Sequence, residues 1–192
     1  MMYQKKHIEV LLLGGTVACV LDEKGQSKTV DLSSFIQTFH EFDGIADIST
    51  NSFSNLKGFE MTISDIIKTA NEIKRIIAED RVDGIVVVMG TNVMEEAAFG
   101  LNLLVQTDIP IVVTGAMRVP HARSADGPGN LSSSISVALS DSSKGLGVLV
   151  LFNDTIHSAD YVQKQHTLNP GALTSEFPLG YVAEGSVSLR VR

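Results

Sequence analysis

The clearest structural signal in the chain is the run Gly84-Ile85-Val86-Val87-Val88-Met89, which is apolar throughout and shows no alternation with polar residues. In a strand with one solvated face, apolar and polar residues alternate, whereas a strand covered on both faces, as in a parallel sheet, is apolar throughout. The run therefore predicts an interior strand of a parallel sheet. The turn Gly90-Thr91-Asn92 follows directly, and the residues after it predict a helix over roughly 93–105.

The same alternation of short apolar runs and longer periodic segments continues along the chain. Helices are predicted over 61–78 and about 130–139, and another is expected to begin near 31–34. Strands are predicted over 8–13, 44–51, 109–114 and 147–152, with a terminal hairpin over 181–183 and 187–191. Together these elements predict a single α/β domain over residues 1–192. It is expected to be a three-layer sandwich around a mainly parallel, flavodoxin/Rossmann-like sheet, with a C-terminal β-hairpin.

Composition excludes several classes of protein. The chain has 192 residues, a formal net charge of −7 and 44% hydrophobic residues. Without clustered lysine and arginine it is not expected to bind nucleic acid directly, and it lacks the roughly 20-residue apolar stretch that crosses a bilayer. The single cysteine, Cys19, cannot form an internal disulfide and is expected to be a small buried side chain. With no secretory signal visible, the chain is expected to be cytoplasmic.

Polar, glycine-containing turns follow three of the predicted strands. They are Gly14-Gly15-Thr16, Gly90-Thr91-Asn92 and Gly115-Ala116-Met117-Arg118. In folds of this kind, ligands bind at the carboxyl ends of the parallel strands. Glycines allow a ligand to approach the backbone and leave amide N–H groups free for an anion or a developing oxyanion. The hydroxyls of Thr16 and Thr91 are therefore expected at the same edge of the sheet.

Four segments carry a resemblance to a known family. They are residues 12–18, 83–96, 110–131 and 147–167, in order and at matching spacing. The sequence resembles the bacterial-type L-asparaginase/glutaminase family in its larger, N-terminal domain. The archaeal subunit of the tRNA-dependent glutamine amidotransferase has similar motifs, so the substrate is left open.

The resemblance implies that a threonine hydroxyl attacks an amide carbonyl, that ammonia leaves, and that water then releases the acid. Thr16 and Thr91 match the two reactive threonines of the family, and Lys164 matches the lysine that moves protons. The N–H groups around Gly90 and the carbonyl near Ala116 would orient the amide. A lysine can act as a base only if burial or its neighbours lower its pKa. Ordinary alternatives remain open: Thr16 as a turn residue, Thr91 as a helix N-cap and Lys164 as a solvated lysine.

The departures from the family pattern concern substrate recognition. Asn92 replaces the aspartate that binds the substrate's α-ammonium, Gly58 replaces the serine that binds its α-carboxylate, and Phe59 replaces a polar neighbour. The mobile-loop tyrosine has no counterpart, and Met89 stands where a histidine is usual. The family's smaller C-terminal domain is expected to be absent. We expect a substrate amide whose α-amine is uncharged, with Phe59 facing an apolar part of it.

The resemblance implies a small-molecule amide as partner and assembly into a dimer or tetramer. No metal or organic cofactor is expected, because the spacing of His157 and His166 suggests no third metal ligand. Arg118 and Asp126 are expected to form a structural ion pair. The alternative function is a non-catalytic or weakly active binding or regulatory domain, or an amidotransferase-like subunit that needs a separate partner domain.

Overall fold

The computed structural model describes residues 5–15, 19–21, 27–29, 39–56, 58–79 and 81–190. The predicted helix start near 31–34, the side chain of Cys19 and all of Thr16 lie outside the described structure. Within the described ranges, no helix is long and apolar enough to cross a membrane.

An eight-stranded sheet forms the centre of the molecule. Its five parallel strands lie in the order β4-β1-β5-β6-β7, and β8, β11 and β12 extend it with antiparallel pairing. The strands are β1 (Lys6–Gly14), β4 (Ala46–Leu56), β5 (Gly84–Val88), β6 (Ile111–Thr114), β7 (Val148–Phe152), β8 (Thr155–Ser158), β11 (Gly180–Ala183) and β12 (Ser186–Leu189).

The predicted interior strand is confirmed. Every residue of β5 is buried, and the strand lies between β1 and β6, with Val86 paired to Val10 on one side and to Val112 on the other. All five residues of β7 are buried as well. The continuous apolar runs therefore mark strands that have no solvated face.

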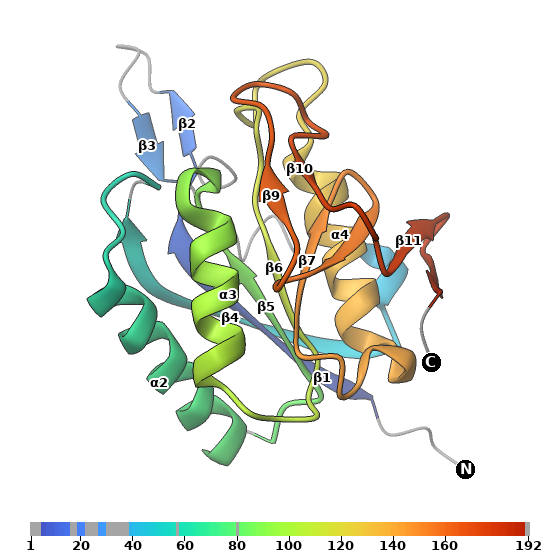
Figure 1. The fold of residues 1–192 in the computed structure, drawn as a ribbon. Helices are drawn as coiled ribbons and strands as arrows, with labels where there is room; N and C mark the ends of the chain where they lie inside the picture. Colours follow the sequence, from blue (N-terminus) through green and yellow to red (C-terminus); the bar gives the residue numbers. More distant parts are fainter. Residues whose placement is uncertain are drawn as a thin grey trace.

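Helices cover both faces of the sheet, so the three-layer prediction is confirmed (Figure 1). The helices α2 (Ile63–Glu79) and α3 (Met94–Leu104) pack together on one face, and α4 (Gly127–Leu139) covers the other. The start of α2 is fixed by Thr62, whose N–H and hydroxyl both donate to the Asp65 carboxylate. The helix α4 begins three residues before the predicted start, because Pro128 occupies its first turn, where a missing N–H costs nothing.

Two short hairpins were not predicted. They pair β2 (Cys19–Leu21) with β3 (Ser27–Thr29), and β9 (Gln163–Lys164) with β10 (Leu173–Thr174). The short antiparallel strand β8 was also missed. It reverses the direction of the chain after β7, and β9 follows it. The predicted terminal hairpin is confirmed as β11 and β12, and it joins the edge of the main sheet.

Candidate active site at the carboxyl edge of the sheet

Three glycines from separate turns lie in direct backbone contact at the carboxyl edge. Gly15 follows β1, Gly58 follows β4 and Gly90 follows β5. A Cβ added to Gly15 would lie 2.5 Å from the Gly90 nitrogen, and one added to Gly90 would lie 2.6 Å from the Gly58 Cα. No side chain fits between these backbones. The turns after β1, β4 and β5 therefore form one continuous main-chain surface.

Thr91 opens the short 3-10 helix η3 (Thr91–Val93), which leads into α3. Its side chain is buried, and the hydroxyl oxygen accepts a hydrogen bond of 2.8 Å from the Lys164 amine. The interpretation of Thr91 as an N-cap is wrong, because Gly90 occupies that position. The threonine hydroxyl instead lies in contact with an amine that is 73 residues away in sequence.

Lys164 lies on β9 and is partly buried rather than solvated. Burial lowers the pKa of its amine below the ordinary value of 10.5, and the negative charge of Glu95 opposes this shift by raising the pKa. The backbone N–H of Lys164 donates to the Glu95 carboxylate. A lysine with a lowered pKa can take up and release a proton near neutral pH more readily than an exposed one.

The positions predicted to contact substrate lie around the same edge. A Cβ on Gly58 would be 3.1 Å from the Asn92 side-chain oxygen and 3.2 Å from the Gly90 Cα, so these three residues are neighbours. Asn92 is exposed, and the Phe59 side chain is 71% exposed. Ala116 is buried just after β6. Thr16, the residue after Gly15, lies outside the described residues, so its proposed role stays a prediction.

The loop after β6 is organised by Asp126 in a way the sequence did not predict. The carboxylate accepts the backbone N–H groups of Met117 and Arg118, each at 2.9 Å. The Arg118 guanidinium donates instead to the Ser124 carbonyl oxygen, also at 2.9 Å. The expected ion pair between Arg118 and Asp126 is therefore wrong. Asn130 completes the loop by donating to the Gly115 carbonyl, which fixes the end of β6.

The two histidines near Lys164 have structural partners. His157 is buried, its Nδ1 lies 2.7 Å from the Ser175 hydroxyl oxygen, and burial lowers its pKa to about 4. The His166 ring nitrogen accepts the N–H groups of Leu168 and Asn169. In the part of the chain that the structure describes, no group of three or more His, Cys, Asp or Glu side chains could hold a metal ion.

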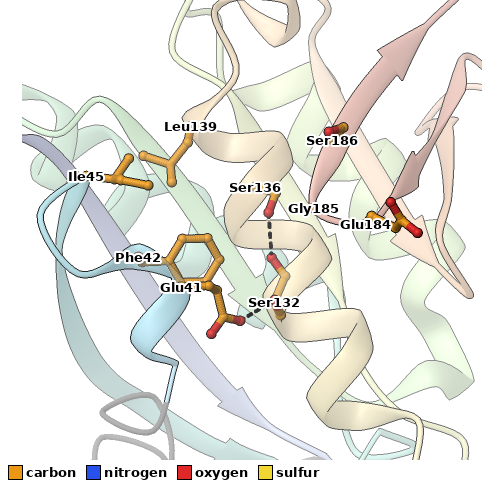
Figure 2. Close-up of a pocket in the computed structure, with 9 residues that line it drawn as sticks. All are labelled: Glu41, Phe42, Ile45, Ser132, Ser136, Leu139, Glu184, Gly185 and Ser186. Atoms are coloured by element: carbon orange, nitrogen blue, oxygen red, sulfur yellow. Dashed lines mark hydrogen bonds between the residues drawn. The ribbon is translucent and has the colours of Figure 1, made fainter.

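Two cavities lie outside the Thr91–Lys164 contact. One, of about 560 Å³, lies between the 3-10 helix η2 (His40–Phe42), α4 and the turn between β11 and β12 (Figure 2). There the Ser132 hydroxyl donates to Glu41, and none of the predicted site residues lines this cavity. The other, of about 460 Å³, is lined by Gln163 and Gln165, which flank Lys164, and by residues of the β10 region.

Comparison with known proteins agrees with this geometry. The family model described as Asparaginase, N-terminal, matches residues 7–192. The chain belongs to the asparaginase family. It is 39% identical over 182 residues to L-asparaginase 2 of Bacillus subtilis, covering 92% of this chain and 48% of that protein. It is 34% identical over 187 residues to the glutaminase-asparaginase of Acinetobacter glutaminasificans, covering 94% and 56% respectively.

A solved asparaginase has the same fold. The crystal structure of a probable cytoplasmic L-asparaginase from Campylobacter jejuni superposes with a TM-score of 0.89 at 35% identity, covering 97% of this chain and 57% of that chain. The asparaginase resemblance inferred from the motifs is confirmed. The chain spans about half the length of the curated relatives it matches. Amide hydrolysis is thus supported as the chemistry of the family.

Sequence reasoning assigned no role to Glu95, although it stands in one of the motifs. The available signal was its spacing. Glu95 follows Thr91 by four residues at the predicted start of a helix, a spacing that brings side chains together in a regular α-helix.

Proposed function

We propose that this chain carries the amide-cleaving half of an asparaginase-like hydrolase and acts through a threonine acyl-enzyme. The observation that carries the proposal is the 2.8 Å contact between the Lys164 amine and the Thr91 hydroxyl oxygen. A threonine hydroxyl is a weak nucleophile that needs an adjacent base. In its neutral form, the Lys164 amine can accept a proton from the hydroxyl.

In this mechanism Thr16 and Thr91 supply the two reactive hydroxyls. A hydroxyl oxygen attacks the amide carbonyl carbon, and its proton passes through Lys164 to the departing nitrogen, which leaves as ammonia. Water then attacks the acyl-threonine ester and releases the carboxylic acid. Free N–H groups around Gly90 would bind the developing oxyanion, and the carbonyl near Ala116 would orient the amide.

We further propose that the substrate is a side-chain amide whose α-amine carries no charge, as in an N-acylated or peptidyl asparagine. Asn92 can accept a hydrogen bond but supplies no negative charge for an ammonium group, and charge-assisted bonds are about twice as strong. Gly58 places no side chain against the nearby Asn92 side-chain oxygen, and the next residue, Phe59, is an exposed apolar residue.

An ammonia-release assay tests both parts of this proposal. The protein is incubated with free L-asparagine, N-acetyl-L-asparagine and asparaginyl peptides, and intact mass spectrometry is used to trap an acyl-threonine. We expect release from the acylated and peptidyl amides, and loss of release in Thr16→Ala and Lys164→Met. A clear preference for free L-asparagine would refute the substrate class, and turnover unaffected by either variant would refute the mechanism.

The alternative is a binding domain that kept the fold without turnover. The uncharged Asn92 is the observation that favours it, because the position lacks the carboxylate that the resemblance implies. A ligand that binds in competition with amides, releases no ammonia and is unaffected by Thr16→Ala would support this alternative. The two functions therefore give opposite results in the same assay.

We also propose that residues 1–192 fold as one domain that self-associates as a dimer or tetramer in the cytoplasm. Domains of this size bury enough surface to be stable alone. The cytoplasmic location is supported by the likeness to the probable cytoplasmic L-asparaginase of Campylobacter jejuni. Light scattering during gel filtration tests the assembly, and a monomer at micromolar concentration would contradict it.

A further inference from the structure

Two successive helical segments, η3 and α3, contact Lys164 at two different points. Thr91 and Glu95 stand four residues apart on the continuous η3–α3 segment. The Thr91 hydroxyl accepts from the end of the Lys164 side chain, and the Glu95 carboxylate accepts from the Lys164 backbone N–H. The main chain and the side chain of one lysine are thus held by two residues that lie four positions apart, on either side of the junction at Val93.

The hairpin that carries Lys164 has little pairing of its own. Among the residues that the structure describes, the two-residue strand β9 pairs with the two-residue β10, and the Gln165 N–H donates one further bond to the Ala172 carbonyl. Short two-stranded hairpins are marginal without packing against another element. A hydrogen bond to a carboxylate is stronger than a neutral one. Val162 before β9 and Leu173 on β10 pack in the hydrophobic core, and the Glu95 contact adds a polar restraint at Lys164 itself.

We propose that Glu95 is a positioning residue, whose carboxylate fixes β9 to the first turn of α3 and thereby holds the Lys164 amine against the Thr91 hydroxyl. The catalytic consequence rests on the proposed function. The positional consequence does not, because it concerns only where Lys164 lies.

Glu95 has two separable effects, one through its hydrogen bond and one through its charge. Within the described residues, it is the charged side chain whose field raises the pKa of Lys164, against the lowering effect of burial. Glutamine at this position keeps a hydrogen-bond acceptor but removes the charge. Alanine removes both. The two variants therefore separate the restraint on β9 from the electrostatic effect on the amine.

Glu96 provides a matched control. It is the adjacent residue in the same first turn of α3, it carries the same charge, and it is exposed. Glu96→Gln and Glu96→Ala change the helix terminus in the same way as the Glu95 variants. Any effect that arises from helix propensity or from the helix dipole will appear in the Glu96 variants as well as in the Glu95 variants.

The test measures Lys164 directly. The rate of acetylation of Lys164 by acetic anhydride is followed against pH by mass spectrometry, because only the neutral amine reacts. Hydrogen exchange of the peptide containing the Lys164 amide is measured in parallel, and circular dichroism confirms that each variant is folded. Neither readout needs an active enzyme.

We expect Glu95→Gln to shift the Lys164 titration to lower pH, since the charge that supports the ammonium form is gone. We expect Glu95→Ala to shift it the other way, toward the ordinary value, because the released hairpin exposes the amine to water. Exchange at the Lys164 amide should accelerate by roughly ten-fold in the alanine variant. Both Glu96 variants should match the parent protein in titration and exchange.

Either of two results would overturn the proposal: unchanged labelling and exchange in Glu95→Ala, or equal effects in the Glu96 pair. If Glu95→Ala fails to fold, hydrogen exchange at the Lys164 amide in Glu95→Gln decides, because a neutral acceptor holds this N–H less strongly than a carboxylate and exchange should still be faster than in Glu96→Gln. If the parent protein releases no ammonia while labelling and exchange respond as expected, the proposed function fails and the positioning role stands. If it is active, Glu95→Ala should lower kcat about ten-fold or more with a smaller change in KM.

Discussion

Gly15 lies against Gly90 so closely that a Cβ on Gly15 would stand 2.5 Å from the Gly90 nitrogen and 2.8 Å from its Cα. This contact joins the end of β1 to the end of β5, and so brings the first glycine turn to the turn that carries Thr91. It also explains why a side chain at position 15 would be costly: the obstacle is main chain, which cannot rotate away.

Gly15→Ala should therefore destabilise the protein far more than Gly44→Ala. Both glycines have positive φ, +93° and +81°, but a Cβ on Gly44 meets nothing within 4 Å. We expect Gly44→Ala to cost about 1–2 kcal/mol from its backbone conformation alone, and Gly15→Ala about 3 kcal/mol or more. Urea unfolding midpoints measure both, and equal midpoints for the two variants would argue against a tight contact between the turns.

The Thr91 hydroxyl should be essential to turnover while its bulk is dispensable. Thr91→Val keeps the shape but removes the acceptor of the Lys164 bond. We expect ammonia release to fall by about 10²–10⁴-fold, as for loss of a proton-transfer group. Thr91→Ser should stay within about ten-fold of the parent, because the hydroxyl remains. A valine variant with the parent rate would exclude Thr91 from the reaction.

Turnover should depend on pH through the neutral form of Lys164. Burial lowers the pKa of this amine, so the neutral form becomes available below the ordinary value of 10.5. Because the base is the deprotonated form, kcat should rise with pH and level off before pH 10.5 is reached. Lys164→Arg, which keeps its proton, should be as inactive as Lys164→Met. A rate that falls over the same range would contradict this role.

Asn92→Asp should change substrate preference rather than the chemical step. An added carboxylate at this edge can pair with an α-ammonium, and a hydrogen bond to a charged group contributes about 1.5–3 kcal/mol. The ratio of kcat/KM for free L-asparagine over N-acetyl-L-asparagine should therefore rise by about ten-fold or more. If the ratio is unchanged, Asn92 does not lie against the α-amine of the substrate.

Stability should fall in mild acid because of His157. Its pKa is about 4 in the folded chain, against 6.5 for the unperturbed side chain, so the unfolded state binds more protons between these values. The stability contribution is complete above pH 6.5 and is lost as the pH falls toward 4, by about 3 kcal/mol. His157→Gln should flatten this part of the profile in thermal melts, whereas Ser175→Ala should keep it.

The layered fold could be predicted from the pattern of apolar residues along the chain. Continuous apolar runs mark β5 and β7, which are covered on both faces, and helical spacing marks the one buried face of α2. The strands β8, β9 and β10 could not be predicted, because their sequences show no periodic pattern. They have two to four residues each, too few for any period to show, and their pairing is set by the tertiary structure.

The candidate site was predictable to different degrees. Gly90 and Thr91 could be placed at the carboxyl edge from local sequence alone, since they directly follow an interior strand. The approach of Lys164 could not be derived from spacing, because a reversal of the chain after β7 brings it back to Thr91. The Asp126 contacts were misjudged because unpaired backbone N–H groups in a loop leave no mark in the sequence.

The contact between Gly15 and Gly90 limits how this candidate site can evolve. Where main chain alone forms the wall of the site, a substitution cannot replace one side chain by a larger or smaller one. The shape of the wall is therefore fixed by the positions at which the strands end. New selectivity has to arise around that wall, through Gly58, where the family has a serine, and through the exposed residues Asn92 and Phe59. Relatives with different amide preferences should accordingly share this inner contour and diverge at its border.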